Sequence, residues 1–298
     1  MEKVSKHHGK LMQLASRDDV EKLGTVRTLT SDKSFSIGRG CNGTCVYLGL
    51  DNNRKPVAVK RILIETGEHL QKLDKEVKLL NLLKSKRSKH IVSYQHFVLG
   101  NPFSYLILDL CEETLADFVK RKDQNYLETR GPVIIKEILT GLLALHSGKN
   151  KILHMDLKPE NILVDIHGHM RLADFGISKI LRNNQTTIKT VSKGTLGWMA
   201  AESFPKEGEK KGRFKRKSDI QVVGMISFYV LTKGQHPFGD RYHRTSNIID
   251  GKPVDLKKLT NAKARDFVEK LIQHNPKDRP YAEKALQHRF LQSNTGMF

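Results

Sequence analysis

The sequence predicts an α+β fold with two lobes, a small β-rich N-terminal lobe that contains one key helix and a larger helical C-terminal lobe. Three observations support this prediction. The 298 residues exceed one average domain, and 38% of them are hydrophobic, which is enough to fill a sizeable core. Runs typical of strands gather in the first third of the chain, whereas helical apolar periodicity dominates the remainder. We expect the two lobes to span residues 34–111 and 112–292.

The first lobe should contain five strands and one helix, preceded by a lead-in. Residues 1–33 are polar with weak periodicity, so we expect them to be partly flexible. Strands are expected where β-branched and aromatic residues gather between turn residues, at 34–38, 45–50, 56–63, 91–99 and 105–111. A helix should follow the third strand, because apolar residues recur there at spacings of three and four: Leu70, Leu73, Val77 and Leu80.

The second lobe should be built from helices. Apolar residues recur with helical spacing over 134–145, and residues 222–231 are almost entirely apolar, which indicates a buried helix. Ser218 and Asp219 precede this buried segment and are plausible caps for it. Two amphipathic helices, at 264–272 and 282–291, complete the lobe, and a short tail follows at 293–298.

Composition narrows the classes of protein and partner. Lys and Arg total 52 against 32 Asp and Glu, a formal charge of +20 that attracts anions in general. The three cysteines have no paired spacing, so neither a disulfide framework nor a zinc site is expected, and a reducing compartment fits. No apolar run is long enough to span a membrane, and the N-terminus lacks the apolar core of a secretory signal. We therefore expect a cytoplasmic protein without a membrane segment, with the nucleus as an alternative location.

Residues 38–43 read GRGCNG and match the phosphate-binding pattern GxGxxG. The residues that follow, 44–48, favour a strand, where a dinucleotide-binding fold would need a helix. The arrangement predicts a strand–turn–strand flap whose backbone N–H groups can bind phosphates. An ordinary hairpin turn is the alternative for this motif on its own.

Lys60 lies near the end of the next expected strand, among small apolar residues, so its ammonium needs an acidic partner or a ligand. Glu76 lies on the expected helix, on the same face as Leu73 and Leu80. A Lys60–Glu76 pair would hold the ammonium where it can bind the α- and β-phosphates of a nucleotide. A purely structural salt bridge is the alternative, but it would not account for the glycine loop.

Residues 154–161 read HMDLKPEN, and residues 174–176 read DFG. With these segments the sequence resembles the eukaryotic protein-kinase family, whose hallmarks are HRDLKxxN and DFG. The resemblance runs over residues 35–291. It implies the bilobal protein-kinase fold and an enzyme that uses ATP and Mg²⁺ to phosphorylate protein substrates.

The resemblance also assigns catalytic roles. Asp156 would accept the proton of the substrate hydroxyl, and Lys158 would neutralise charge on the transferred phosphoryl group. Asn161 and Asp174 would supply the oxygen ligands that Mg²⁺ prefers. Lys158 and Thr195 resemble the serine/threonine form of the kinases rather than the tyrosine form, so the expected acceptors are serine and threonine.

The implied nucleotide site extends beyond these residues. Leu108 would be the gatekeeper, and the backbone of Asp109 and Cys111 would bond to adenine. The ring would be sandwiched by Cys45, Ala58 and Leu163, for which simple core packing is the alternative. The expected ATP-binding residues are Ile37, Gly38, Arg39, Gly40, Cys41, Asn42, Gly43, Cys45, Ala58, Lys60, Leu108, Asp109, Cys111 and Leu163. Structural support would come from Asp219, which resembles the aspartate that braces the catalytic loop, and from Glu202 and Arg279, which resemble an ion pair under the activation segment.

Within the kinases, the sequence is similar to the inositol-requiring kinase/endoribonuclease family of unfolded-protein-response sensors. The similar phrases lie at residues 57–63, 109–115, 194–200 and 236–239. Members of that family carry a membrane span and a ribonuclease domain that have no counterpart in these residues, so endoribonuclease activity is not expected from them. The family acts through dimers, which makes a homodimer one expected assembly.

Two positions depart from the kinase pattern. Met155 replaces the arginine that normally pairs with a phosphorylated activation loop, a contact that needs a charged fork. Candidate phosphorylation sites in that loop are Thr186, Thr187, Thr190 and Ser192, and nearby cations are Lys179, Arg182 and Lys189. We expect alanine at all four hydroxyl positions to change turnover less than about tenfold. Ala201 replaces a proline, which is not expected to inactivate the enzyme.

Two basic runs, residues 84–89 and 206–217, are expected to be solvated surface. Docking of acidic substrates, nucleic-acid contact and nuclear import are the functional alternatives. Two rival functions stay open: a nucleotide-binding pseudokinase scaffold and an RNA-associated regulatory module. The pseudokinase hypothesis has no missing catalytic group to support it, because Lys60, Glu76, Asp156, Asn161 and Asp174 are all present.

Overall fold

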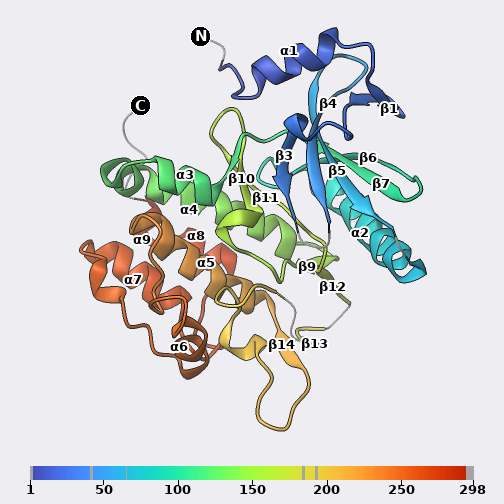
Figure 1. The fold of residues 1–298 in the computed structure, drawn as a ribbon. Helices are drawn as coiled ribbons and strands as arrows, with labels where there is room; N and C mark the ends of the chain where they lie inside the picture. The colour runs from blue at the N-terminus through green and yellow to red at the C-terminus, as the bar shows by residue number, and fades with distance from the viewer. Residues whose placement is uncertain (1–2, 41–42, 65, 183–184, 192–193, 293–298) are drawn as a thin grey trace. The chain divides into compact units, whose positions relative to one another are not determined.

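The computed structural model describes residues 3–40, 43–64, 66–182, 185–191 and 194–292. The chain divides into two compact units (Figure 1). We call residues 1–112 with 164–168 the N-unit, and residues 113–163 with 169–298 the C-unit. Each unit is described by itself.

An antiparallel sheet of seven strands forms the body of the N-unit. Its strand order is β1-β2-β4-β5-β7-β6, and β3 pairs with β4. The strands are β1 Glu21–Leu23, β2 Val26–Thr28, β3 Ser36–Arg39, β4 Cys45–Leu50, β5 Pro56–Leu63, β6 Tyr94–Val98 and β7 Phe103–Asp109. Strands β4 and β5 occupy the expected ranges without change, because alternating apolar residues and a turn at residues 51–55 define both.

The helices of the N-unit are α1 His8–Ser16 and α2 Gly67–Ser85, with a short 3₁₀ turn at Lys33–Phe35. Thr66 caps α2 by accepting a hydrogen bond from the His69 N–H group. The apolar stripe predicted for α2 is only partly buried: Leu73 and Leu80 are buried, but Leu70 is 43% exposed. Leu79 and Leu83, which lie outside the predicted stripe, are buried as well, so the buried face of α2 differs from the predicted one.

The expectation of a separate, partly flexible lead-in over residues 1–33 is wrong for residues 8–28. These residues form α1, β1 and β2, and the two strands belong to the N-unit sheet. Leu11 and Leu14 of α1 are buried in a cluster with Leu29, Phe35 and Leu48. The physical reason is that α1 needs only one short apolar face to cover the end of the sheet next to β4 (Figure 1).

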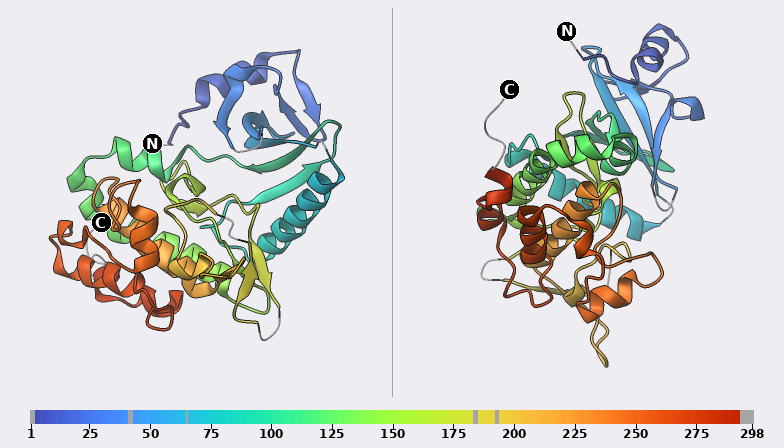
Figure 2. Two further views of the ribbon diagram at one scale, coloured as in Figure 1. Left: turned by 60° about the horizontal axis from the view of Figure 1, so that its bottom comes forward. Right: turned by 90° about the vertical axis from the view of Figure 1, so that its left-hand side faces the viewer.

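Helices dominate the C-unit (Figure 2). They are α3 Leu115–Arg121, α4 Gln124–His146, α5 Arg216–Leu231, α6 Arg244–Asp250, α7 Ala262–Leu271, α8 Ala282–Leu286 and α9 Arg289–Gln292, with 3₁₀ turns at Pro159–Asn161, Ala201–Ser203 and Leu256–Lys258. Helix α5 packs against both α4 and α7. No helix in the described part of the chain is long and apolar enough to cross a bilayer.

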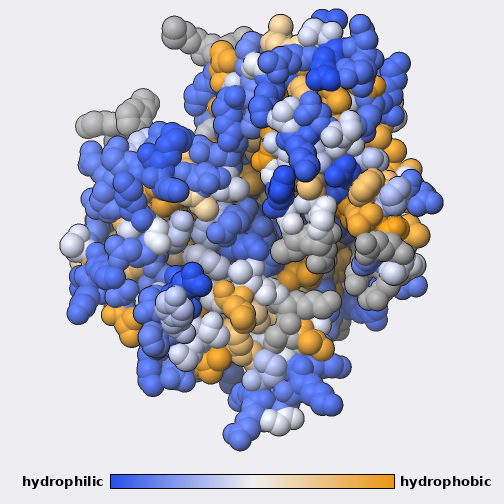
Figure 3. Space-filling model, in the orientation of Figure 1, coloured by the Kyte–Doolittle hydropathy of each residue, from blue (hydrophilic) through white to orange (hydrophobic). Residues whose placement is uncertain are grey.

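Short strands complete the C-unit. Strands β8 Glu113–Thr114, β10 Ile162–Val164 and β11 Met170–Leu172 form one small sheet; β9 Lys151–Leu153 pairs with β12 Lys179–Leu181, and β13 Ile188–Thr190 pairs with β14 Gly212–Phe214. Residues 206–211, the first half of the second basic run, form an exposed loop before β14, which is hydrophilic at the bottom of Figure 3.

Two helix boundaries differ from expectation. Helix α5 begins at Arg216, so Ser218 and Asp219 lie in its first turn instead of before it. The Ser218 hydroxyl accepts a hydrogen bond from the Lys215 N–H group over 2.9 Å, which satisfies a donor at the helix start. The segment expected as one helix over 282–291 is divided into α8 and α9, because Gln287 closes the first helix with turn-type bonds to Lys284 and Ala285.

Candidate active site

The glycine-rich segment lies between β3 and β4, which pair in antiparallel fashion with Arg39 opposite Cys45. The Gly40 N–H group donates to the Thr44 carbonyl over 2.8 Å and closes the turn. Gly43 has a φ of +71°, a conformation that favours glycine. The predicted strand–turn–strand arrangement is confirmed, and Cys41 and Asn42 lie outside the described residues.

Lys60 and Glu76 form an ion pair within the N-unit. The Lys60 Nζ atom lies 3.1 Å from Glu76 Oε1, and the two side chains are 17% and 12% exposed. Strand β5 carries the lysine and helix α2 carries the glutamate, as the spacing predicted. Because burial makes an unpaired ammonium costly, this pair fixes the lysine on β5, an inner strand of the sheet between β4 and β7.

The residues expected around adenine occupy neighbouring strands. Ala58 of β5 lies directly opposite Leu108 of β7, so their side chains share one face of the sheet. Cys45 lies further along β4, opposite Arg61, beside the buried cluster of Val57 and Val59. The remaining expected residues are half-buried Ile37, Gly38 and Asp109, exposed Arg39, buried Cys111, and half-buried Leu163 on β10. Whether these residues enclose adenine stays a prediction.

Asp156 is the centre of a hydrogen-bond network in the C-unit. Its Oδ1 atom accepts from the Thr195 backbone N–H over 3.0 Å and from the Thr195 hydroxyl over 2.9 Å. Its Oδ2 atom accepts from Lys158 Nζ over 3.3 Å and from Asn161 Nδ2 over 3.0 Å. Lys158 also donates to the Thr195 hydroxyl over 2.7 Å. The structure therefore brings together four residues that are spread over 40 positions of the sequence.

Asp219 holds the loop that carries Asp156. Its Oδ2 and Oδ1 atoms accept from the backbone N–H groups of His154 and Met155 over 3.0 and 3.1 Å. His146 at the end of α4 adds a third contact, because its Nε2 atom lies 2.9 Å from Asp219 Oδ2. All of these atoms are buried, so each bond would leave a costly unpaired group if it were lost. The contact of His146 was not predicted, although a histidine at the end of an apolar helix could have indicated a buried polar contact.

His154 connects this loop to Asp174. Its ring lies 3.0 Å from the Ala173 carbonyl and 5.0 Å from the ring of buried Phe175. Complete burial lowers the pKa of His154, so the imidazole is neutral at pH 7. Asp174 itself has a φ of +60°, which turns its carboxylate to an exposed position between two buried neighbours.

The donor set of these residues suits a hard divalent cation. The amide nitrogen of Asn161 is occupied by Asp156, so the amide oxygen is the atom left to bind a cation. The exposed carboxylate of Asp174 supplies two further oxygens. Oxygen ligands with waters and phosphates completing the shell are what Mg²⁺ prefers. Among the described residues, no cluster of three His, Cys, Asp or Glu side chains offers a rival metal site.

Comparison with known proteins decides the family. Residues 32–291 match the family described as the protein kinase domain. The chain belongs to the protein kinase family. It is 34% identical over 289 residues to the human serine/threonine-protein kinase/endoribonuclease IRE2, covering 92% of this chain and 30% of that protein.

Two further relatives are also named as serine/threonine-protein kinases. The chain is 34% identical over 283 residues to the probable serine/threonine-protein kinase irlA of Dictyostelium discoideum, covering 86% of this chain and 19% of that protein. It is 33% identical over 275 residues to the serine/threonine-protein kinase/endoribonuclease ire-1 of Caenorhabditis elegans, covering 85% and 26%. The chain described in this article thus spans under a third of the length of these relatives. The predicted membership of the protein kinase family and the predicted likeness to the kinase/endoribonuclease family are confirmed.

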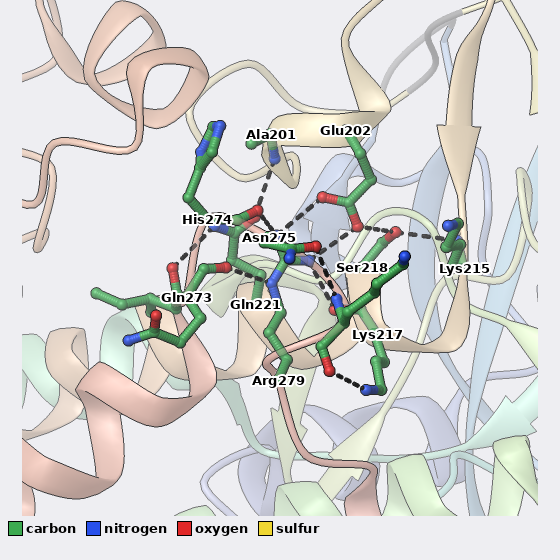
Figure 4. A network of polar contacts seen from close by, with 12 residues as sticks. Ala201, Glu202, Lys215, Lys217, Ser218, Gln221, Gln273, His274, Asn275 and Arg279 are labelled. Carbon is green, nitrogen blue, oxygen red and sulfur yellow. Dashed lines mark hydrogen bonds and ion pairs between the residues drawn. The ribbon is translucent and has the colours of Figure 1, made fainter.

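The ion pair expected under the activation segment, between Glu202 and Arg279, is present (Figure 4). Arg279 Nη1 and Nη2 donate to the two carboxylate oxygens of Glu202 over 2.8 and 2.9 Å. Arg279 is fully buried, and its other donors reach the carbonyls of Lys217, Gln273 and His274. The pair is therefore a satisfied buried charge and not a surface bridge.

Ala201 takes part in the same network, which explains the departure from proline. Its N–H group donates to Gln221 Oε1 over 2.9 Å, a bond that a proline cannot make (Figure 4). The Gln221 amide donates in turn to the Ile272 carbonyl over 3.1 Å. The role of Gln221 was not predicted from the sequence, although a polar residue inside an apolar helix could have indicated a buried hydrogen bond.

Met155 lacks the charge of the usual arginine, and its side chain also packs in the apolar interior. Its side chain is 6% exposed and packs in a cluster with Leu153, Leu181 and Ile188, and with Met199 and Phe214. A guanidinium at this position would be buried among apolar groups without a partner. The kinase therefore fastens its activation segment to the catalytic loop by apolar packing.

The candidate phosphorylation sites differ in environment. Thr190 lies on β13, where its hydroxyl accepts from Lys179 Nζ over 3.0 Å. Thr187 is half-buried and Thr186 is exposed. Ser192 lies outside the described residues. Pairing of β13 with β14 holds this part of the segment without any phosphate.

Proposed function

We propose that this kinase domain transfers the γ-phosphoryl group of ATP to serine and threonine hydroxyls of proteins, with Mg²⁺ as the divalent metal. The observation that carries the proposal is the placement of Asp156. One carboxylate oxygen is oriented by Thr195, and the other is oriented by Lys158 and Asn161. A base oriented in this way meets the main demand of phosphoryl transfer, which is positioning and charge stabilisation.

Each residue has a distinct task in the proposed reaction. Asp156 accepts the proton of the attacking hydroxyl and aims its oxygen at the γ-phosphorus. Lys158, 3.3 Å from Asp156, offsets the negative charge of the transferred group. Lys60, fixed by Glu76, binds the α- and β-phosphates. Asn161 and Asp174 would hold Mg²⁺, which when bound neutralises charge on the β- and γ-phosphates.

Acceptor preference follows from the same network. Thr195 donates to the base and accepts from Lys158, so its hydroxyl lies next to the position where an acceptor oxygen must arrive. We infer that the short side chains of serine and threonine suit this position beside the base. We expect tyrosine, whose oxygen lies farther from its backbone, to be a poor acceptor.

The test is incubation of the domain with labelled ATP, Mg²⁺ and matched peptides that differ only in a central Ser, Thr or Tyr. The proposal predicts labelling of the Ser and Thr peptides at rates at least tenfold above the Tyr peptide. Replacement of Lys60 by Met should remove labelling of all three. Equal labelling of Tyr peptides would contradict the acceptor preference, and labelling that survives Lys60→Met would contradict the assignment of the nucleotide site.

The pseudokinase alternative has no support, because the base, both cations and both proposed metal ligands are present in ordered positions. Self-association, nucleic-acid binding and a cytoplasmic or nuclear location stay predictions.

A further inference from the structure

Residues 3–7, which we call the N-terminal segment, lie against the part of the N-unit that follows β7. The Lys6 backbone N–H donates to Glu112 Oε2 over 2.8 Å, a contact across 106 positions of sequence. Lys3 Nζ donates to the His167 carbonyl over 2.9 Å. All four residues belong to the N-unit. The proposed reaction uses neither of these contacts.

Glu112 is held from two directions. Its carboxylate accepts from Lys6, and its backbone N–H donates to the Val164 carbonyl of β10 over 2.8 Å. It directly follows Cys111, whose backbone is expected to bond to adenine. Residues 110–112 lie outside helices and strands, so their conformation depends on contacts with residues from elsewhere in the chain.

Helix α1 extends this contact toward the glycine-rich segment. Leu11 and Leu14 of the helix are buried in an apolar cluster. Ile37 and Leu110 pack against the same cluster. Leu110 lies between the two residues expected to bond to adenine, and Ile37 directly precedes Gly38 of the glycine-rich motif. The N-terminal segment and α1 together therefore contact both parts of the N-unit that are expected to bind the nucleotide.

These contacts restrict the residues that would meet adenine. A segment without fixed structure loses conformational entropy when a ligand orders it, and this loss weakens binding. Contacts that order the segment beforehand raise affinity without a new contact to the ligand. The carboxylate of Glu112 is suited to this role, because a hydrogen bond to a charged acceptor is stronger than one to a neutral acceptor.

We propose that Glu112 is a positioning residue for ATP. Bound to Lys6 of the N-terminal segment, it fixes residues 110–112 in the conformation that meets adenine, and it does so without touching the nucleotide. The N-terminal segment thus contributes to the affinity of the kinase domain for ATP. This role rests on the proposed function for the location of the adenine site.

The test measures binding of MgADP to the full chain by titration calorimetry, together with KM for ATP and kcat on a serine peptide. Glu112→Ala should raise the Kd for MgADP and the KM for ATP about fivefold, with little change in kcat, because no catalytic group is lost. Loss of the charge alone would act in the opposite direction, since removal of a nearby carboxylate favours binding of an anion. Unchanged or tighter binding by Glu112→Ala would overturn the proposal, as would a fall in kcat at constant KM.

A conservative variant and a surface control separate the hydrogen bond from the charge. Glu112→Gln keeps an oxygen that can accept from the Lys6 N–H, so its Kd for MgADP should stay within about twofold of wild type. Asp74→Ala removes an exposed carboxylate of the same unit, paired with exposed Lys78, and should leave the Kd unchanged. Equal weakening by the Gln and Ala variants at position 112 would contradict the role of the bond.

A second pair of variants tests the donor. Lys6→Pro removes the backbone N–H, whereas Lys6→Ala keeps it and removes only the side chain. The proline variant should weaken MgADP binding as much as Glu112→Ala, and the alanine variant should bind like wild type. Combining Lys6→Pro with Glu112→Ala should weaken binding no further, because both changes remove the same bond. Additive losses would overturn the proposal.

The calorimetric readout does not require phosphoryl transfer, so two failures can be distinguished. If the wild-type chain binds no MgADP, the proposed function is wrong and the role of Glu112 falls with it. If the wild type binds MgADP and Glu112→Ala binds it equally well, the nucleotide site stands and only the positioning role of Glu112 is wrong.

Discussion

The hydroxyl of Thr195 donates a 2.9 Å hydrogen bond to Oδ1 of Asp156, across 39 positions of sequence. The same hydroxyl accepts a 2.7 Å bond from Lys158 Nζ. One oxygen atom therefore fixes the separation of the proposed base from the proposed phosphate-neutralising cation. The geometry of the C-unit site depends on this residue of the activation segment as much as on the catalytic loop.

Thr195→Val should lower the turnover number about 10- to 100-fold. Valine keeps the shape and the backbone N–H bond to Asp156 but removes two hydrogen bonds, which together are worth about 1–3 kcal/mol. Steady-state kinetics with a peptide substrate would check this. Thr195→Ser is the control, and it should retain most of the turnover with little change in KM for ATP. A valine variant as fast as the serine variant would contradict the role of the hydroxyl.

Asp219→Ala should destabilise the C-unit by roughly 3 kcal/mol, because it leaves two backbone N–H groups and the His146 ring without their buried acceptor. Urea unfolding followed by tryptophan fluorescence would measure the loss, since Trp198 lies in the same unit. Asp250→Ala, which removes an exposed carboxylate of the C-unit paired with Lys252, is the matched control and should cost much less. A loss no larger than that of the control would show that the bonds do not brace the loop.

Alanine at Thr186, Thr187, Thr190 and Ser192 together should change turnover less than about tenfold, under about 1.4 kcal/mol in the barrier. The reason is that Met155 joins an apolar cluster, so a phosphate in the segment has no charged contact with the catalytic loop. Purified-protein assays of the fourfold variant would check this. A larger loss would mean that phosphorylation acts on catalysis by a route other than position 155.

Stability should fall as pH drops below 6.5, because two buried histidines are neutral in the folded chain. Burial, followed by the charge of Arg244, lowers the pKa of His236 to about 2, and burial lowers the pKa of His154. The unfolded chain binds these protons at pH values below about 6.5, whereas the folded chain does not. His236 should cost about 1.4 kcal/mol at one pH unit below that value, and His154 acts in the same direction.

Urea unfolding at pH 7.5 and 5.5 would measure this dependence. His236→Gln should reduce the drop between the two pH values, whereas a change at exposed His8 should not. An unchanged drop in His236→Gln would show that this ring is protonated, and so solvated, in the folded chain.

Local patterns predicted much of the fold, and distant contacts account for what they missed. Strands β4 and β5 match their expected ranges because alternation and turn residues are encoded within each segment. Helix α1 was missed because its two buried leucines cover residues that follow much later, such as Leu29 and Leu48. A short polar helix with a narrow apolar face has no distinctive periodicity of its own.

In the site, too, local patterns predicted some residues and distant contacts determine the others. Spacing identified Lys60 with Glu76 and the residues around Asp156, because the chemistry restricts which residue types can serve. The role of Gln221 and the apolar surroundings of Met155 depend on partners from other elements, which no local pattern reports.

The most direct measurement compares phosphoryl transfer by the wild-type domain and by Asp156→Asn, with labelled ATP, Mg²⁺ and a serine peptide. Asparagine keeps the shape of the side chain and removes its basicity, so turnover should fall at least about 100-fold while nucleotide binding persists. Equal transfer by the two proteins would contradict the assignment of Asp156 as the base and, with it, the account of this domain as a protein kinase.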